Sequence, residues 1–255
     1  MTDEAIRVAV LGRDGRMGSE AVRAVEDAAD LELVAALGRG DDLSELVRRG
    51  AQVVVDLTVP AATRENVRFA VSHGIHAVVG TTGWDDAALA ELEAQLADSP
   101  GTGVLIAPNF ALGSVLASAF AAQAAKYFES VEIIELHHPE KVDAPSGTAV
   151  RTAELVSKVR TAAKVPASPD ATETLLDGAR GADVDGVRVH SVRLRGLVAH
   201  QEVLLGSAGE QLTLRHDSFD RVSFMPGVLL GLRTVASRPG LAYGLDSYLD
   251  LGGNA

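Results

Sequence analysis

The chain has 255 residues, 47% of them hydrophobic and 23% charged, which is the composition of a globular protein of one large or two small domains. Its net charge of −12 argues against nucleic acid and anionic membranes as partners. No apolar run is long enough to predict a transmembrane helix. The chain contains no cysteine, which excludes disulfides and thiolate metal sites, and its first residues lack the basic and apolar regions of a signal peptide. We therefore expect a cytoplasmic protein.

A strand, a glycine turn and a helix open the sequence. Ile6 to Leu11 is a short apolar strand, and a helix is predicted from the turn to about Ala29. The turn reads G-R-D-G-R-M-G, a variant of the commoner G-x-G-x-x-G spacing. Gly12 allows the tight turn, Gly15 lets the backbone approach a pyrophosphate at the helix N-terminus, and Gly18 lets the helix pack on the strand. This pattern predicts a dinucleotide-binding unit, and the alternative is an ordinary strand–helix turn.

Strands and helices then alternate, which predicts a parallel sheet. We expect further strands at Leu31 to Leu37, Val53 to Leu57, His76 to Gly80 and Val104 to Ala107, with helices at Ala61 to His73 and Asp85 to Ala97. Ligands of such sheets lie at the carboxyl ends of the strands. Gly80-Thr81-Thr82 and Ala107-Pro108-Asn109-Phe110 are therefore expected to line the nicotinamide side.

The second half changes character after a long Ala-rich helix, Ala111 to Phe128, which is expected to join two domains. Short apolar or alternating runs predict antiparallel strands of a second sheet at Val131 to His137, Val187 to Leu194, Ala199 to Gly206 and Gln211 to His216. Helices are predicted at Thr148 to Lys164, Arg221 to Ala236 and Asp246 to Leu251, and a loop at Val165 to Asp170.

Chemistry is concentrated in the stretch from Glu135 to Ala149, E-L-H-H-P-E-K-V-D-A-P-S-G-T-A, between a strand and a helix. Its two prolines exclude a helix and a central strand, so the stretch is an ordered loop. The loop carries His137, His138, Lys141 and Asp143, and it ends in Ser146-Gly147-Thr148 at a helix start, where anions bind. Each residue alone also fits a surface, turn or cap role.

This stretch resembles the signature of the dihydrodipicolinate reductase family. The pieces V-L-G-R-D-G-R-M-G, G-T-T-G-W and A-P-N-F follow that family's order, so the resemblance spans nearly the whole chain. It implies an NAD(P)H-dependent reductase of lysine and diaminopimelate synthesis that acts on a small dicarboxylate. The implied fold is α/β, a doubly wound parallel dinucleotide-binding sheet at residues 1–108 and 218–255. An inserted α+β domain with a mixed sheet, at 109–217, would bind the substrate and build a homotetramer.

The resemblance also implies roles for individual residues. His137 would be the proton donor or acceptor, Lys141 a second proton donor, and His138, Gly147 and Thr148 would bind the substrate carboxylates. The cofactor would be bound by Gly12, Arg13, Asp14, Gly15, Arg16 and Met17, by Gly80, Thr81 and Thr82, and by Ala107, Pro108, Asn109 and Phe110. From charge alone we favour a different role for Lys141, in which it stays charged and holds a carboxylate, because a dianion in an acidic protein needs cations.

The chain departs from the family at Gly38, where many members carry Asp or Glu. A carboxylate there would accept hydrogen bonds from the ribose of NADH and repel the 2′-phosphate of NADPH. Arg39, the next residue, can bind that phosphate, so we expect NADPH to be preferred and NADH accepted. The alternatives are that Arg39 points to solvent, or that Asp41 or Asp42 supplies the missing carboxylate.

Three other functions are alternatives to this reductase. Another dinucleotide-dependent enzyme, such as an aspartate dehydrogenase, fits the N-terminal half but not the histidine, lysine and P-S-G-T cluster. A non-catalytic NAD(P) sensor has no need of His137 or Lys141. A zinc hydrolase with His137, His138 and Glu140 as ligands is disfavoured because adjacent residues on an extended segment point apart, and we expect no metal.

Overall fold

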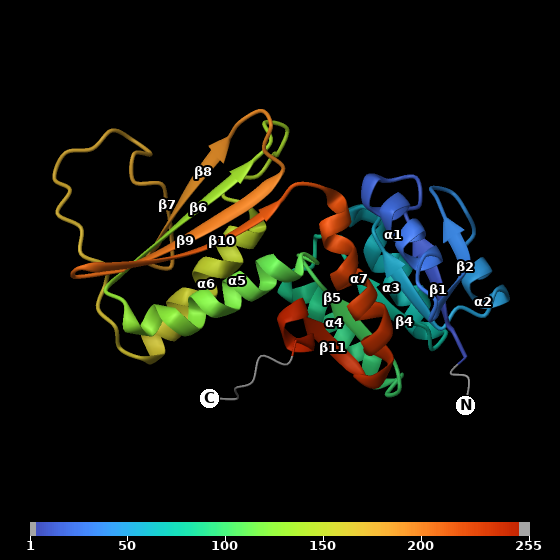
Figure 1. Ribbon diagram of the computed structural model, residues 1–255. Helices are drawn as coiled ribbons and strands as arrows, with labels where there is room; N and C mark the ends of the chain where they lie inside the picture. The colour runs from blue at the N-terminus through green and yellow to red at the C-terminus, as the bar shows by residue number, and fades with distance from the viewer. Residues whose placement is uncertain (1–3, 250–255) are drawn as a thin grey trace. The chain divides into compact units, whose positions relative to one another are not determined.

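The computed structural model describes residues 4–249 (Figure 1). The chain forms two compact units. One contains the residues up to Ala111 and those from Arg221 onward, and the other is the continuous segment Leu112–Asp220. One segment is therefore inserted into another unit. Among residues 4–249, no helix combines the length and the apolar character needed to cross a bilayer.

The first unit is built on a six-stranded sheet. Its strands are β1 (Ile6–Leu11), β2 (Leu31–Leu37), β3 (Val53–Asp56), β4 (His76–Val79), β5 (Gly103–Ile106) and β11 (Gly240–Tyr243). They lie in the order β11-β5-β4-β3-β1-β2, and every neighbouring pair is parallel. All residues of β3 and β5 are buried, as in strands covered on both faces. The predicted doubly wound parallel sheet is confirmed.

Helices cover both faces of this sheet. They are α1 (Arg16–Glu26), α2 (Ser44–Arg48), α3 (Pro60–Ser72), α4 (Asp86–Ala97) and α7 (Met225–Thr234). Leu46 of α2, Val67 of α3 and Leu92 of α4 share one core cluster with alternate residues of β1. On the other face, α7 packs on β3, β4 and α1. This layering leaves the carboxyl ends of the strands to carry the loops that form the first site.

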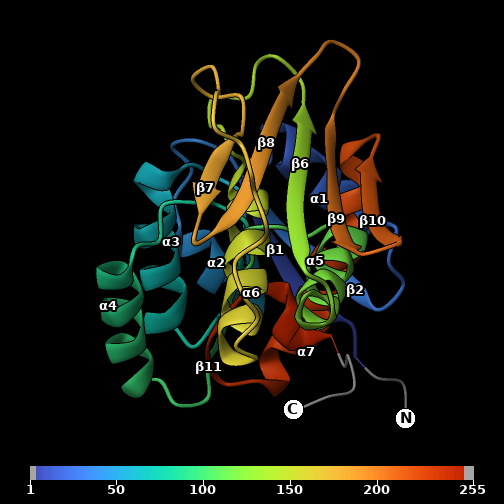
Figure 2. The same ribbon diagram turned by 90° about the vertical axis from the view of Figure 1, so that its left-hand side faces the viewer.

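The second unit is a five-stranded sheet with two helices on one face (Figures 1 and 2). Its strands are β6 (Ser130–His137), β7 (Ala182–Val184), β8 (Val187–Arg193), β9 (Ala199–Ser207) and β10 (Glu210–Ser218), and its helices are α5 (Leu112–Ala124) and α6 (Gly147–Ala162). The order is β10-β9-β6-β8-β7. Strand β6 is antiparallel to β9 and parallel to β8, so the predicted mixed sheet is confirmed, although β8 was expected among the antiparallel strands. Val131, Ile133, Val203 and Leu205 form its core with α5 and α6.

Several boundaries differ from the sequence prediction. Strands β7 and β11 and helix α2 were not predicted, because each has only three to five residues and shows no resolvable period. The predicted helix at 221–236 is divided into a 3₁₀ turn at Arg221–Phe224, α7 and a second 3₁₀ turn at Val235–Ser237. Pro226 lies in the first turn of α7, where its missing N–H costs nothing. In place of the helix at 246–251 there is a 3₁₀ turn, Leu245–Tyr248, and residues 250 and 251 lie outside the described residues.

Candidate active site

The glycine turn after β1 has the geometry of a phosphate-binding turn. Gly12 has a φ of +89°, and a Cβ there would lie 2.7 Å from the Leu57 carbonyl oxygen. A Cβ on Gly18 would lie 1.9 Å from the Gly12 oxygen, so α1 packs directly on the turn. Within residues 4–249, no backbone carbonyl accepts the amides of Arg16 and Met17 at the start of α1. These free amides and the helix dipole suit an anion, so this turn fits a dinucleotide pyrophosphate.

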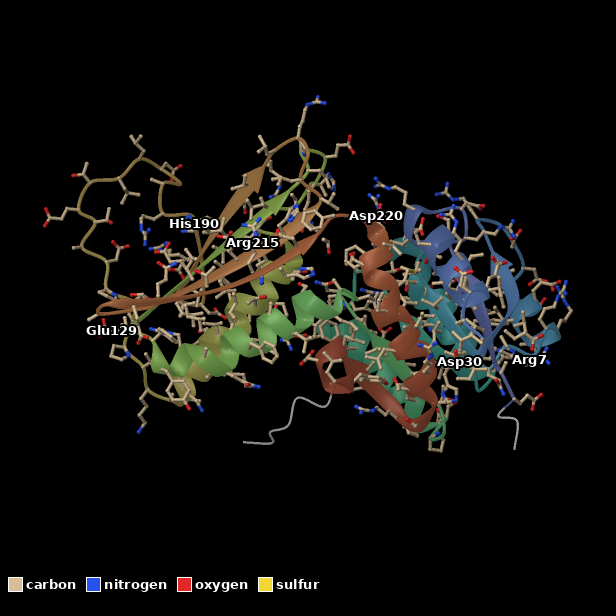
Figure 3. All side chains as sticks on the ribbon, in the orientation of Figure 1. Arg7, Asp30, Glu129, His190, Arg215 and Asp220 are labelled. Carbon is tan, nitrogen blue, oxygen red and sulfur yellow. The ribbon has the colours of Figure 1, made fainter. Side chains whose placement is uncertain are left out.

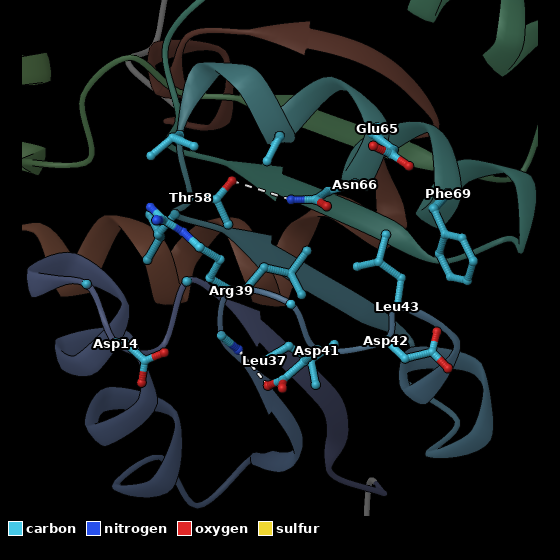
Figure 4. A pocket seen from close by; sticks show the side chains of 18 residues that line it. Asp14, Leu37, Arg39, Asp41, Asp42, Leu43, Thr58, Glu65, Asn66 and Phe69 are labelled. Carbon is cyan, nitrogen blue, oxygen red and sulfur yellow. Dashed lines mark hydrogen bonds between the residues drawn. The ribbon is translucent and has the colours of Figure 1, made fainter.

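A pocket of about 840 Å³ opens beside this turn (Figure 4). Gly12, Asp14 and Gly15 line it from the turn, and α3 supplies Asn66 and Phe69. The loops after β2 and β3 complete the wall with residues 38–43 and 57–59. Both apolar and polar side chains line the pocket, and its volume is large enough for an adenosine.

Charged residues at the end of β2 differ in how they are held. The Asp41 carboxylate accepts a hydrogen bond from Gly38 N (2.9 Å) and pairs with Arg13 (3.1 Å). The Asp42 carboxylate accepts from Ser44 N at the start of α2 (2.9 Å) and pairs with Arg48. Arg39 is exposed, and among the described residues no hydrogen bond or ion pair holds its guanidinium. It lines the pocket, and its side chain lies below Thr58 (Figure 4).

The loops after β4 and β5 lie together because these strands are neighbours. A Cβ on Gly80 would lie 2.7 Å from both the Leu57 side chain and the Phe110 ring, so a larger residue would displace these side chains. Thr81 is buried and donates to the Asp56 carboxylate (3.0 Å). That buried carboxylate also accepts from Thr58 N and Oγ1 and from Asn66 Nδ2, at 2.6 to 2.9 Å. Asp56 therefore holds the ends of β3 and β4 and helix α3 in one arrangement.

In the second unit, the loop between β6 and α6 brings cationic and amide donors onto one carboxylate. Lys141 Nζ donates to Asp143 Oδ1 (2.6 Å), and the Gly147 amide donates to Asp143 Oδ2 (3.3 Å). Burial raises the pKa of Asp143, but the bonds from Lys141 and the backbone outweigh it and lower that pKa overall. Ser146 caps α6 through its hydroxyl, which accepts from Ala149 N. The Lys141 ammonium group and the Gly147 amide at the start of α6 thus both donate to the same carboxylate.

A second, buried carboxylate lies beneath this loop. Glu135 is fully buried in β6 and accepts from His137 Nδ1 (2.5 Å), from both Arg193 Nη atoms (2.7 and 2.8 Å) and from Ser146 N (3.2 Å). Burial raises its pKa, but hydrogen bonds from His137, Arg193 and Ser191 outweigh this and lower the pKa of Glu135 to about 2. His138 differs, because its Nδ1 is buried without any hydrogen-bond partner among the described residues. Such an atom fits a ligand that supplies the missing bond.

The predicted residues therefore fall into three groups. The large pocket is lined by Gly12, Asp14, Gly15 and Arg39, and the neighbouring residues Arg13, Arg16 and Met17 do not line it. A second group, Gly80, Thr81, Thr82, Ala107, Pro108, Asn109 and Phe110, lies at the ends of β4 and β5. The third, His137, His138, Lys141, Gly147 and Thr148, surrounds the start of α6. Among residues 4–249, no group of three His, Asp or Glu side chains is arranged to hold a metal ion.

Sequence reasoning missed Asp56, Glu135 and Arg193. A period-two pattern could have placed Glu135 on the same strand face as His137. Asp56 ends a buried strand, which is also a readable signal. Arg193 gives no local signal, since it reaches Glu135 from β8, 58 residues along the chain.

Known proteins resemble this chain along almost its full length. Residues 6–110 match the family model "Dihydrodipicolinate reductase, N-terminus" and residues 113–249 match "Dihydrodipicolinate reductase, C-terminus". The 4-hydroxy-tetrahydrodipicolinate reductase of Streptomyces griseus is 67% identical, covering 96% of this chain and 98% of that protein. The enzyme of the same name from Nocardia farcinica is 64% identical over 96% and 99%.

Solved structures show the same likeness. A dipicolinate-bound dihydrodipicolinate reductase from Paenisporosarcina sp. TG-14 superposes with a TM-score of 0.84 at 40% identity, covering 96% of this chain and 100% of that one. An amine dehydrogenase from Mycobacterium smegmatis shares only the fold, with a TM-score of 0.65 at 13% identity over 94% and 95%. The two family models together match nearly the whole chain and the relatives exceed 60% identity, so the chain belongs to the dihydrodipicolinate reductase family.

Proposed function

We propose that the chain catalyses the NAD(P)H-dependent reduction of 4-hydroxy-tetrahydrodipicolinate to tetrahydrodipicolinate in lysine and diaminopimelate biosynthesis. The observation that carries this proposal is the convergence of Lys141 Nζ and the Gly147 amide on one carboxylate. In the free chain Asp143 takes that position, and a substrate carboxylate would take the same donors. The relatives named as this reductase support the same reaction. The nicotinamide cofactor, when bound, supplies the hydride.

The residues of the loop supply the proton and bind the substrate carboxylates. Hydride addition leaves an enamine-like carbanion equivalent that needs a proton. We assign this proton to Nε2 of His137, because Nδ1 is bonded to Glu135. Lys141 holds and neutralises a substrate carboxylate. The unpartnered Nδ1 of His138, the Gly147 amide and Thr148 complete the binding of the dianion. The first unit binds the cofactor and the inserted segment binds the substrate.

Gly147 adds steric support for this assignment. A Cβ added to Gly147 would meet no atom of the described chain within 4 Å, although the residue begins a helix, where alanine is the better helix former. The protein itself therefore does not require glycine here. A bound carboxylate that approaches the amide closely would require it.

The test is a spectrophotometric assay of NAD(P)H oxidation with freshly generated product of aspartate semialdehyde and pyruvate condensation. His137→Gln should lower kcat by roughly 10²–10⁴-fold, the usual contribution of a general acid. Lys141→Ala should lower kcat and raise KM, because it removes both charge and position. Near-normal turnover in either variant would remove that residue from the mechanism.

We also propose that NADPH is preferred over NADH. Asp41 and Asp42, the two carboxylates that could replace the missing family acid, are held by Gly38, Arg13, Ser44 and Arg48. Arg39 is the cation that lines the pocket, and it has no such partner in the described part of the chain (Figure 4). A 2′-phosphate would give its guanidinium a bidentate partner.

A homotetramer is proposed from the open face of the second sheet. Strand alternation places Ile134, Leu136, Val192 and Leu204 on the face opposite α5 and α6, and each is only half-buried in the single chain. Ion pairs around His190 and Arg215 flank this apolar strip (Figure 3). A second copy of the same face would cover it. A cytoplasmic location, expected from the lack of cysteine, stays a prediction.

A further inference from the structure

The buried carboxylate of Glu135 accepts hydrogen bonds from several other residues. Glu135 and His137 are two residues apart on β6, so both side chains lie on one face of the strand. His137 Nδ1 lies 2.5 Å from Oε2, and Arg193 donates to both carboxylate oxygens from β8. Ser146 donates from the start of α6. Groups from three elements thus fix the carboxylate in one orientation.

This arrangement determines which ring nitrogen of His137 carries hydrogen. An ionised carboxylate only accepts hydrogen bonds, and Glu135 stays ionised at neutral pH because its pKa is about 2. The neutral imidazole must therefore carry its hydrogen on Nδ1. Nε2 is left as the nitrogen that can bind and release a proton. The backbone of His137 is also held, because its carbonyl oxygen accepts a hydrogen bond from Leu194 N.

Arg193 links the same carboxylate to the substrate-binding loop. Besides its two bonds to Glu135, its Nη2 donates to the carbonyl oxygen of Asp143 (2.6 Å). Asp143 in turn accepts from Lys141 and Gly147. The Glu135–Arg193 pair therefore contacts His137 on one side and, on the other, Asp143, to which Lys141 and Gly147 donate.

We propose that Glu135 is a positioning residue that fixes the tautomer and orientation of His137 for proton delivery from Nε2, while Arg193 positions the Lys141 loop. This proposal rests on the proposed function, in which His137 is the proton donor. It assigns separate effects to the two partners. Loss of Glu135 should act on kcat, and loss of Arg193 should act mainly on KM.

Glu135→Gln should lower kcat by roughly 10- to 100-fold with KM within about threefold of the parent, the range seen when a group that orients a functional histidine is lost. A glutamine keeps one acceptor oxygen and has a donor NH₂ in place of the other, so it cannot accept from His137, from both Arg193 Nη atoms and from Ser146 N at the same time. Arg193→Gln should raise KM by roughly tenfold and keep more of kcat than Glu135→Gln does. Equal effects of the two variants on both constants would indicate a merely structural pair and overturn the proposal.

A second measurement reads the tautomer directly. Imidazole ¹⁵N NMR of histidine-labelled protein, with His137→Gln to identify the signal, should find hydrogen on Nδ1 of the neutral ring in the parent. In Glu135→Gln the Nε2–H form should appear. An unchanged Nδ1–H signal in a folded Glu135→Gln variant with parental kcat would overturn the proposal.

The chain offers a matched control on the same strand. Glu132 is also bonded to a histidine, His190 Nε2 at 2.7 Å, and to an arginine, Arg180, but on the opposite face and partly exposed. Glu132→Gln should leave kcat within about twofold of the parent. If Glu135→Gln does not fold, Glu135→Gln/Arg193→Gln, which leaves neither charge unpaired, should show the same loss of kcat. A parent without reductase activity would contradict the proposed function instead, and the NMR signal would still confirm or overturn the tautomer.

Discussion

Replacement of Arg39 by alanine should weaken NADPH and leave NADH nearly unchanged. Arg39 is the pocket cation that no described residue holds, whereas Arg13 is occupied by Asp41, Asp14 and the Ala36 carbonyl. The guanidinium can therefore bind a 2′-phosphate without first breaking an internal ion pair. For NADH, which lacks that phosphate, Arg39 has nothing to bind.

The expected magnitude follows from the type of contact. A bidentate, charge-assisted contact contributes about 1.5–3 kcal/mol, which is roughly ten- to a hundred-fold in affinity. Because Arg39 is exposed, salt screens the contact, and the lower part of that range applies above about 0.1 M ionic strength. The assay is kcat/KM with each cofactor at two salt concentrations. Arg23→Ala, which removes the same charge from the exposed side of α1, is the control.

Gly38→Asp gives the complementary test. A Cβ at Gly38 would lie 2.2 Å from the Asp14 carboxylate, so Asp14, with 74% of its side chain exposed, must swing aside. Gly38→Asp should shift preference toward NADH, and Asp14→Ser in the same chain should sharpen the shift because it removes both the clash and the repulsion. A parent that favours NADH tenfold, or an Arg39→Ala variant with the parental NADPH/NADH ratio, would show that Arg39 does not set the preference.

Three further outcomes are expected. Gly147→Ala should fold at least as stably as the parent, since nothing lies within 4 Å of the added methyl, yet raise KM by roughly tenfold or more; an unchanged KM would remove this amide from the substrate site. The ionised Glu135 should stabilise the fold by up to about 3 kcal/mol above its ordinary pKa of 4.5, and this contribution is lost as the pH falls from 4.5 toward its folded value of about 2. Urea unfolding at about pH 7 and about pH 3 should therefore show a smaller acid-induced loss in Glu135→Gln than in the parent, and an equal loss would contradict the assignment. Light scattering should give about four times 26.5 kDa for the parent and a smaller mass for Leu204→Arg, whereas a parent of 26.5 kDa would contradict the tetramer.

The sequence predicted those elements whose signal is local. Strands β1 to β5 are apolar runs that end in glycine or polar turns, and a single-sequence pattern is enough to find them. Pairing is not local. Nothing in Val187 to Leu194 indicates that β8 lies parallel to β6, because the direction depends on the long connection through α6 and the loop after it. Strand β11 has only four residues, of which the first is Gly240, and it pairs with β5 at the edge of the sheet.

The candidate site also contains residues that are close in sequence and residues that are far apart in sequence. His137, Lys141 and Gly147 lie within eleven residues, so their sequence spacing alone brings them together. The groups that orient them come from elsewhere. Arg193 reaches Glu135 across 58 residues, and Thr81 reaches Asp56 across 25. A sequence pattern thus identifies the groups that touch substrate more readily than the groups that hold them in place.

The interrupted path of the chain sets an order for folding during synthesis. Leu112–Asp220 is continuous, so all its strands are available before α7 and β11 leave the ribosome. The other unit waits for these two elements, because α7 covers β3 and β4 and β11 closes the edge at β5. Until then, the face of the parallel sheet that α7 will cover and the edge of β5 stay open to chaperones or to other nascent chains. Leu112–Asp220 should therefore become protease-resistant first, and the segment that precedes it should become so only after α7 and β11 have emerged.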